Sequence, residues 1–262
     1  MLAFSASWLA LREPADQAAR DVDLMQKAAA LVSDTPTVLD LGSGTGSTVR
    51  AFGSLLPAST NWTLVDIDSE LLDLAGQMVP TASLHKADLR EVNQLPDEGI
   101  DLVTGSALLD LVTEQWLKEM SQRYEVPFYF ALTYDGRMRW EPAASEDEQI
   151  TASFNLHQQK DKGMGEALGP GAEEVAVRVF EQAGFEVFVA DSDWKLTSAD
   201  GDLQSELLRG IASAASEMGN LVAEQWLEDK LQKIDSLSCT IGHKDILAIP
   251  STTASGGENE AG

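Results

Sequence analysis

The stretch Val38-Leu39-Asp40-Leu41-Gly42-Ser43-Gly44-Thr45-Gly46-Ser47 decides the fold of this chain. Its apolar first part predicts a short buried strand, and its three alternating glycines predict a sharp turn. A helix is expected to begin at Ser47, because apolar residues follow at Val49, Phe52 and Leu55. Glycine permits positive φ angles and lets the backbone approach a ligand closely, and the free N–H groups of a helix start form a partly positive rim. The stretch therefore predicts a nucleotide-sized shelf at the carboxyl edge of a parallel sheet.

The spacing of the glycines separates two kinds of nucleotide site. Dinucleotide-binding loops carry G-x-G-x-x-G, which places a pyrophosphate on the helix N-terminus. Here the spacing is G-x-G-x-G, and Asp40 stands two residues before the first glycine. A carboxylate at that place disfavours an anionic ligand and suits one that carries an ammonium and a sulfonium group. The pattern argues against a nicotinamide-dependent reductase.

The pattern resembles motif I of the class I S-adenosylmethionine-dependent methyltransferases, (D/E)-x-G-x-G-x-G, and three further segments follow in the order of that family. Apolar runs at 62–65, 82–87 and 100–104 are followed by Asp66, by Asp88-Leu89 and by Gly105-Ser106. The resemblance implies that Asp66, with Ile67 beside it, binds the ribose, and that Asp88 and Leu89 meet the adenine. It places the methionine part of the cofactor beside Gly105 and Ser106. It assigns to motif I the cofactor-binding residues Asp40, Gly42, Ser43, Gly44 and Gly46, with S-adenosylmethionine as cofactor and S-adenosylhomocysteine as product.

Each of the three acids also has a structural interpretation. Asp40 could hold the glycine turn by accepting hydrogen bonds from its N–H groups. Asp66 could bond nearby backbone at the end of its strand, and Asp88 could be a helix N-cap. Asp68 or Ser69 is the expected N-cap of the next helix, which is why the ribose role is assigned to Asp66.

The resemblance implies a Rossmann-like α/β fold, with a seven-stranded, mostly parallel sheet and helices on both faces. Residues 1–250 are expected to form a single domain, with further strands at 126–132, 185–190 and 241–249 and a helix at 171–183. Residues 133–170 lack a clear period but are rich in aromatics, which predicts a packed lid inserted after strand 5. A helical insertion is expected at 200–235, between strands 6 and 7, and a disordered tail at 251–262.

The region 1–35 is expected to cap the cofactor. Residues 14–32 have helical spacing of apolar positions, with Pro14 placed in the first turn. In the related family an extra helix before the first strand often covers the cofactor. Arg20 would then reach the methionine carboxylate, and the alternative is a solvated surface arginine.

Methyl transfer from a sulfonium is an in-line displacement on an activated donor, so the protein mainly positions the acceptor and excludes water. The chain shows no Ser-His-Asp, paired-carboxylate or metal-ligand signature. A base is needed only for a protonated acceptor, and the candidate catalytic residues are His157, Tyr134 and Asp135. Asp110 follows the fourth strand, near where acceptors often sit, and its alternative is a helix-surface carboxylate.

The composition and one missing motif limit the class of molecule that can accept the methyl group. The net charge is −25, from 43 acids against 18 bases, which argues against nucleic acid or an anionic membrane as partner. Residues 104–107 read Thr-Gly-Ser-Ala and lack the (D/N/S)-P-P-(Y/F/W) motif of methyltransferases that act on base amines or glutamine amides. The resemblance therefore points to O- or N-methylation of a small molecule, by a monomer or homodimer.

The single cysteine, Cys239, excludes an internal disulfide and a cysteine-rich zinc site. No signal peptide or membrane-spanning run is recognised, so a cytoplasmic location is expected. The alternative function is a non-catalytic module that binds S-adenosylmethionine or S-adenosylhomocysteine as a sensor or as the partner of another enzyme. Turnover on any acceptor separates the two.

Overall fold

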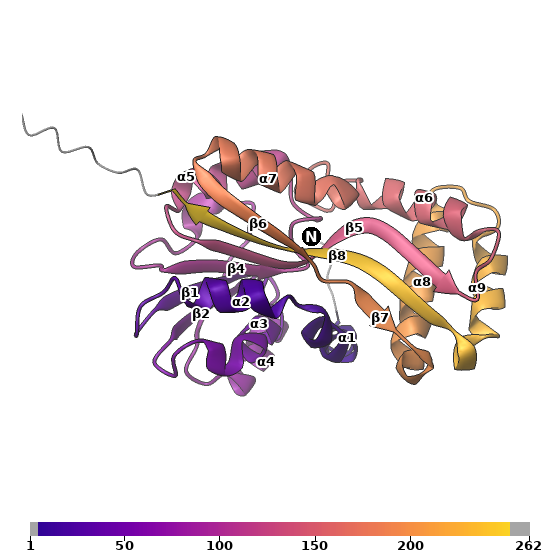
Figure 1. Cartoon of the computed structure of the whole chain (residues 1–262), viewed down its shortest axis with the longest axis horizontal. Coiled ribbons are helices and arrows are strands. Elements are labelled where there is room, and N and C mark those ends of the chain that lie inside the picture. Colours follow the sequence, from indigo (N-terminus) through magenta and orange to yellow (C-terminus); the bar gives the residue numbers. More distant parts are fainter. Residues whose placement is uncertain (1–4, 252–262) are drawn as a thin grey trace, which may run out of the picture.

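A single mixed sheet organises the computed structural model, which describes residues 5–251 (Figure 1). Its strand order is β3-β2-β1-β4-β5-β8-β6, and β7 pairs with β8. Neighbours from β3 to β5 run parallel, whereas β8 is antiparallel to β5, β6 and β7. The strands are β1 (Thr37–Leu41), β2 (Asn61–Asp66), β3 (Ser83–Lys86), β4 (Leu102–Ser106), β5 (Phe128–Glu141), β6 (Phe185–Asp191), β7 (Trp194–Leu196) and β8 (Ser238–Pro250).

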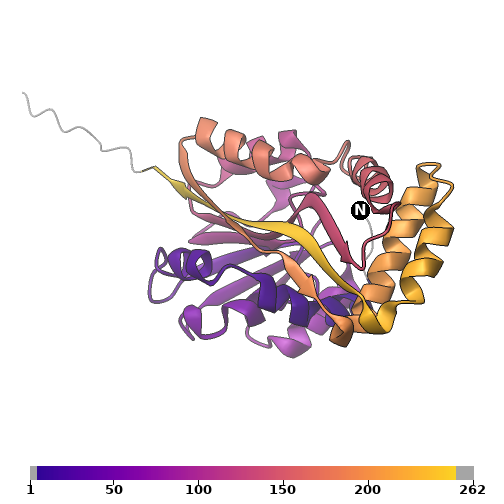
Figure 2. The same cartoon turned by 45° about the vertical axis from the view of Figure 1, so that its right-hand side comes forward.

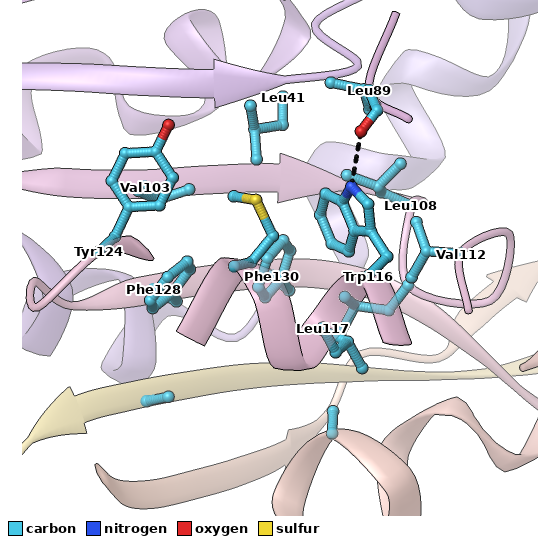
Figure 3. Packing of buried hydrophobic residues seen from close by; sticks show 14 of the residues in the cluster. Leu41, Leu89, Val103, Leu108, Val112, Trp116, Leu117, Tyr124, Phe128 and Phe130 are labelled. Carbon is cyan, nitrogen blue, oxygen red and sulfur yellow. Dashed lines mark hydrogen bonds between the residues drawn. The ribbon is translucent and has the colours of Figure 1, made fainter. Parts of the chain in front are cut away.

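Helices cover both faces of the sheet, as expected from the sequence. The α-helices are α1 (Ala6–Ala19), α2 (Val22–Ala29), α3 (Ser47–Phe52), α4 (Ser69–Met78), α5 (Glu114–Arg123), α6 (Asp147–Gln158), α7 (Ala172–Gln182), α8 (Gly201–Glu217) and α9 (Ala223–Leu231). On one face, α5 and α7 pack on the sheet around Phe128 and Phe130 (Figure 3). On the other face, α2, α3 and α4 pack around Leu64 and Tyr129. The Rossmann-like architecture is therefore confirmed.

The sheet contains one strand more than the expected seven. The extra strand is β7, which lies just after β6 in the chain and pairs with the first half of β8. Strand β8 starts at Ser238, well before its residues that pair with β6. The edge of β8 that β6 leaves unpaired is the edge with which β7 pairs.

The single helix expected over 14–32 is in fact two helices. Ser5 caps α1 by accepting a 3.1 Å hydrogen bond from Trp8 N–H, so Pro14 lies inside the helix and not in its first turn. Asp21 starts a second helix, because its carboxylate accepts a 2.7 Å bond from Leu24 N–H. The chain turns between them at Arg20.

The region 133–170 is more regular than its sequence indicated. The fifth strand does not end at Leu132 but continues to Glu141, since β8 supplies a partner along its length despite two register shifts. Helix α6 follows and packs with α8 and α9 in a third apolar cluster around Trp140 and Trp226. Figures 1 and 2 show these three helices grouped at one end of the sheet.

No helix within residues 5–251 is both long and apolar enough to cross a bilayer. The tail predicted at 251–262 lies, apart from Ser251, outside the described residues.

Candidate cofactor site

The glycine loop has the backbone shape that its sequence predicts. Gly42, Gly44 and Gly46 all adopt positive φ angles, of 63°, 51° and 80°. Ser43 N–H donates to the Val65 carbonyl at 3.0 Å, which fixes the turn against β2. A Cβ at Gly44 would also stand 3.0 Å from the Leu9 side chain, so a larger residue meets both backbone strain and α1.

Asp66 joins the loop to the end of β2. Its Oδ2 accepts a 2.8 Å hydrogen bond from Gly44 N–H, and its Oδ1 accepts one of 3.0 Å from Asp68 N–H. Asp68 is the N-cap of α4, as expected, through bonds from Glu70 and Leu71 N–H. The structural interpretation of Asp66 is thus realised, yet its side chain also lines the cavity described below. Its ribose role stays a prediction.

Asp40 is buried beneath the loop. Its Oδ1 accepts a 2.8 Å bond from the Thr104 hydroxyl on β4, not from the loop N–H groups. Its Oδ2 is buried and has no hydrogen-bond partner among the described residues. Burial raises the pKa of this carboxyl to about 6, against the opposing effect of the Thr104 and Thr48 hydroxyls.

Arg20 is not a solvated arginine, because only 5% of its surface is exposed. Its Nη2 donates a 2.9 Å bond to Ser106 Oγ at the end of β4. Its Nε and Nη1 are buried and unpartnered within residues 5–251. A buried guanidinium with free donors is costly unless an acceptor joins it, so this side chain points to a missing anionic or polar partner.

These elements surround a cavity of about 540 Å³, within the usual range for a small-molecule site. Its walls come from the glycine loop, the start of α4, the segment after β4 and α1. The lining residues are Leu9, Arg12, Asp16, Gly42, Ser43, Gly44, Thr45, Ser47, Thr48, Asp66, Ile67, Asp68, Ser69, Glu70, Leu71, Ser106, Ala107, Leu108 and Leu111.

Residues 38–125 match the family model of the methyltransferase domain. The match begins in β1 and spans the glycine loop, Asp66, Asp88 and the end of β4. These residues form a methyltransferase domain of the class I S-adenosylmethionine-dependent type. S-adenosylmethionine is therefore the cofactor of this enzyme.

A search of curated proteins found no match to the methyltransferase. Among solved structures, the YcgJ protein from Bacillus subtilis is 15% identical with a TM-score of 0.54, over 87% of this chain and 97% of that chain, and it shares the fold. A SAM-dependent methyltransferase from Aquifex aeolicus is 18% identical over 71% of this chain and 91% of its own, with a TM-score of 0.48. Geranyl diphosphate C-methyltransferase from Streptomyces coelicolor A3(2) is 11% identical over 87% and 78%, with a TM-score of 0.49.

Of the predicted cofactor residues, six line the cavity of the methyltransferase: Gly42, Ser43, Gly44, Asp66, Ile67 and Ser106. Gly46 shapes the loop, and Gly105 lies against Phe130 in the sheet. Asp40 and Arg20 lie behind the residues that line the cavity. Arg20 contacts this lining through its hydrogen bond to Ser106.

Asp88 and Leu89 do not line this cavity. The Asp88 carboxylate pairs with Arg90, whose Nε donates at 2.9 Å, and this ion pair lowers the pKa of Asp88. Leu89 is buried, and its carbonyl accepts a 2.8 Å bond from Trp116 Nε1 (Figure 3). Their adenine role stays a prediction.

The three candidate catalytic residues lie outside the cavity lining as well. Tyr134 is buried and donates a 2.7 Å bond to Asn155 Oδ1, and burial raises its pKa. Asp135 accepts a 2.6 Å bond from Arg137 Nε. His157 lies between Glu217 and Lys162, with Nε2 3.1 Å from Glu217 Oε2 and Nδ1 3.2 Å from Lys162 Nζ. A catalytic role for any of the three stays a prediction.

The sequence predicted that the N-terminal region caps the cofactor, but it did not identify the α1 residues that line the cavity, which include Arg12 and Asp16. Arg12 and Asp16 pair with each other at 2.8 Å, and Asp16 also accepts a 3.0 Å bond from Trp194 Nε1 on β7. Their i, i+4 spacing is visible in the sequence, but which element they face is not.

Asp110 is a second residue that the structure places differently. It lies in a turn, not on a helix surface, and its carbonyl accepts a 2.9 Å bond from Gly169 N–H. Only 8% of its surface is exposed, and its Oδ1 is buried without a partner among residues 5–251. Burial raises the pKa of this carboxyl to about 6, with Arg12 and Lys162 opposing the shift.

Proposed function

We propose that this methyltransferase transfers a methyl group from S-adenosylmethionine to an oxygen or nitrogen atom of a small molecule. The observation that carries the proposal is the cavity of about 540 Å³ between the glycine loop and α1. Its lining includes Asp66 and the start of α4, and also Ser106 and Leu111. In this proposal the nucleoside lies against the first group, and the methionine part and the acceptor lie against the second.

The methionine end is supported by unsatisfied polar groups of both signs. Arg20 offers two free donors beside Ser106, and Asp40 Oδ2 and Ser43 Oγ also lack partners within the described residues. Ser43 lines the cavity and can accept a hydrogen bond from the ammonium group of an amino-acid zwitterion, whereas Arg20 and Asp40, behind the wall, place charges of opposite sign near its carboxylate and its ammonium group. Because Arg20 itself does not line the cavity, its effect on the carboxylate passes through Ser106.

A small acceptor fits the boundaries of the site. Helix α1 covers the glycine loop with Leu9, and Leu108 and Leu111 form the adjoining wall. The charge of −25 disfavours polyanionic substrates. In this account residues 1–250 act as one domain, with 1–35 as cap, 133–170 as lid and 200–235 as helical insertion. A cytoplasmic location and a monomer or homodimer remain predictions from the sequence.

The transfer step needs little acid–base machinery. The electron pair of the acceptor attacks the methyl carbon in line with the departing sulfur, which keeps the electrons of the broken C–S bond. An O–H or N–H acceptor also loses a proton. Asp110 is not part of the cavity lining, but it is buried next to Leu111, which is, and we propose that its carboxylate receives the proton.

The test is transfer of tritium from methyl-labelled S-adenosylmethionine to a panel of small amines, phenols and carboxylic acids. We expect labelled product with the wild-type enzyme and none with the Gly44→Asp variant. A wild-type protein that binds S-adenosylhomocysteine but labels no acceptor would favour the non-catalytic binding module.

A further inference from the structure

Helix α1 presents one face to the cofactor cavity. Leu9, Arg12 and Asp16 line the cavity at helical spacing. Glu13 stands between them on the same side and contacts α3, the helix that follows the glycine loop. Its Oε1 and Oε2 accept hydrogen bonds of 2.6 Å each from Arg50 Nε and Nη2. This bidentate geometry is the strongest form of a carboxylate–guanidinium pair.

Arg50 joins this pair to the glycine loop itself. Its Nη1 donates a 2.7 Å hydrogen bond to the carbonyl of Thr45, a residue that lines the cavity. One guanidinium therefore connects α1 with the loop backbone. The Arg50 and Glu13 side chains are only 22% and 16% exposed, so water weakens the pair less than it would weaken a surface pair. The contact of Leu9 with Gly44 lies beside it.

A separate set of contacts holds α1 to β7. Asp16 accepts a bond from Trp194 on β7, and the Arg12 guanidinium lies 5.0 Å from the centre of the Trp194 ring. Within residues 5–251, Glu13–Arg50 is the only ion pair that connects α1 to another element. Helix α1 thus has polar attachments to β7 and to the cofactor loop, and its apolar residues Leu11 and Ala15 also pack against the cluster around Trp140 and Trp226.

We propose that Glu13 and Arg50 are positioning residues for cofactor binding, which hold α1 against the glycine loop and so retain the bound cofactor. The inference rests on the proposed placement of S-adenosylmethionine in this cavity. When the pair is intact, Leu9 and Arg12 stay over the ligand. When it is broken, α1 loses its attachment on the side of the loop, and the ligand leaves faster.

The test compares S-adenosylhomocysteine binding to the full-length wild type, Glu13→Gln and Glu206→Gln. Glutamine keeps the size of Glu13 but removes its charge, and it leaves the Arg50 bond to Thr45 in place. Glu206 pairs with Arg209 on the exposed face of α8 and is the matched control. Calorimetry gives the affinity, stopped-flow tryptophan fluorescence gives the dissociation rate, and thermal unfolding reports stability.

We expect Glu13→Gln to dissociate about tenfold faster, with an association rate within about twofold of wild type. Arg50→Lys should show a similar loss, and the double variant should be less than additive, because both changes break one pair. If Glu13→Gln lowers the melting temperature but keeps the wild-type affinity and dissociation rate, the pair is only structural and the inference is wrong. If the wild type itself does not bind, the proposed function fails, which is a distinct result.

Discussion

Gly44 N–H donates a 2.8 Å hydrogen bond to Asp66 Oδ2, and this bond ties the glycine loop to the end of the neighbouring strand. The second oxygen of Asp66 accepts from Asp68 N–H at the start of α4. One carboxylate thus fixes two backbone segments of the cavity wall while it lines the cavity. The shape of the loop and the lining of the cavity therefore depend on the same side chain.

Replacement of Asp66 should impair the site through both roles. Asp66→Asn retains the volume but turns one acceptor into a donor that faces a backbone N–H. We expect S-adenosylhomocysteine to bind at least about tenfold more weakly, since a bond to a charged acceptor is worth about 1.5–3 kcal/mol. Calorimetry measures this loss, with Asp73→Asn on the exposed side of α4 as control. Wild-type affinity in Asp66→Asn would contradict the proposed ribose end.

Asp40 should make the ligand-free enzyme less stable as the pH rises from about 4 to 6. Its pKa is raised from 3.8 to about 6 by burial. Below pH 4 the carboxyl is protonated in both the folded and unfolded states, so stability is full there. Between pH 4 and 6 the unfolded chain ionises first, and about 3 kcal/mol of unfolding free energy is lost by the upper end of the window.

Urea unfolding of wild type and Asp40→Asn at several pH values isolates this contribution. Asparagine does not titrate, so the variant should gain stability relative to wild type as the pH increases through the window. Asp110 contributes with the same sign and is unchanged in this comparison. Parallel pH profiles would show that Asp40 is ionised in the folded state throughout.

Asp110 should affect turnover and spare cofactor binding. Asp110→Asn removes the proposed proton acceptor, so kcat on an O–H or N–H acceptor should fall by about a hundredfold or more, while S-adenosylhomocysteine affinity stays within about twofold. In the wild type, kcat/KM should rise with pH through about 6, as the carboxyl ionises. Asp34→Asn, at an exposed position, is the control. Unchanged turnover in Asp110→Asn would exclude it as the base.

Asp245 should contribute strongly to folding. It is fully buried and accepts bonds from Tyr129 OH at 2.7 Å, from Asp21 N–H at 2.9 Å and from Leu132 N–H at 2.9 Å. We expect Asp245→Asn to lower the free energy of unfolding by about 2–4 kcal/mol, and Tyr129→Phe, which removes one bond, by about 1 kcal/mol. Equal losses in urea unfolding would mean that the two backbone bonds contribute nothing.

The part of the site that the sequence predicted is the part built from neighbouring residues. Asp40 lies in β1, the glycine loop follows β1, and Asp66 ends β2. The order and direction of these strands are predicted from short apolar runs, so the placement of these residues follows from parallel pairing. The six predicted residues that line the cavity lie in the loop after β1, at the end of β2 or just after it, or at the end of β4.

The rest depends on contacts between distant segments. The Asp110 carbonyl accepts a hydrogen bond from the distant Gly169 N–H, and the bond between Asp16 and Trp194 joins residues 178 positions apart. The extension of β5 to Glu141 depends on β8, whose early start at Ser238 has no local signal. Helical spacing in the first thirty residues showed an apolar face but not that Asp21 starts a new helix.

The most direct measurement of the central claim is calorimetric titration of the full-length protein with S-adenosylhomocysteine, with NADH in parallel. The account predicts one site of about micromolar or tighter affinity for S-adenosylhomocysteine, no binding of NADH, and loss of the site in Gly44→Asp. That variant introduces a side chain at a positive φ and against Leu9. Binding of NADH in place of S-adenosylhomocysteine, or full affinity in Gly44→Asp, would contradict the placement of the cofactor.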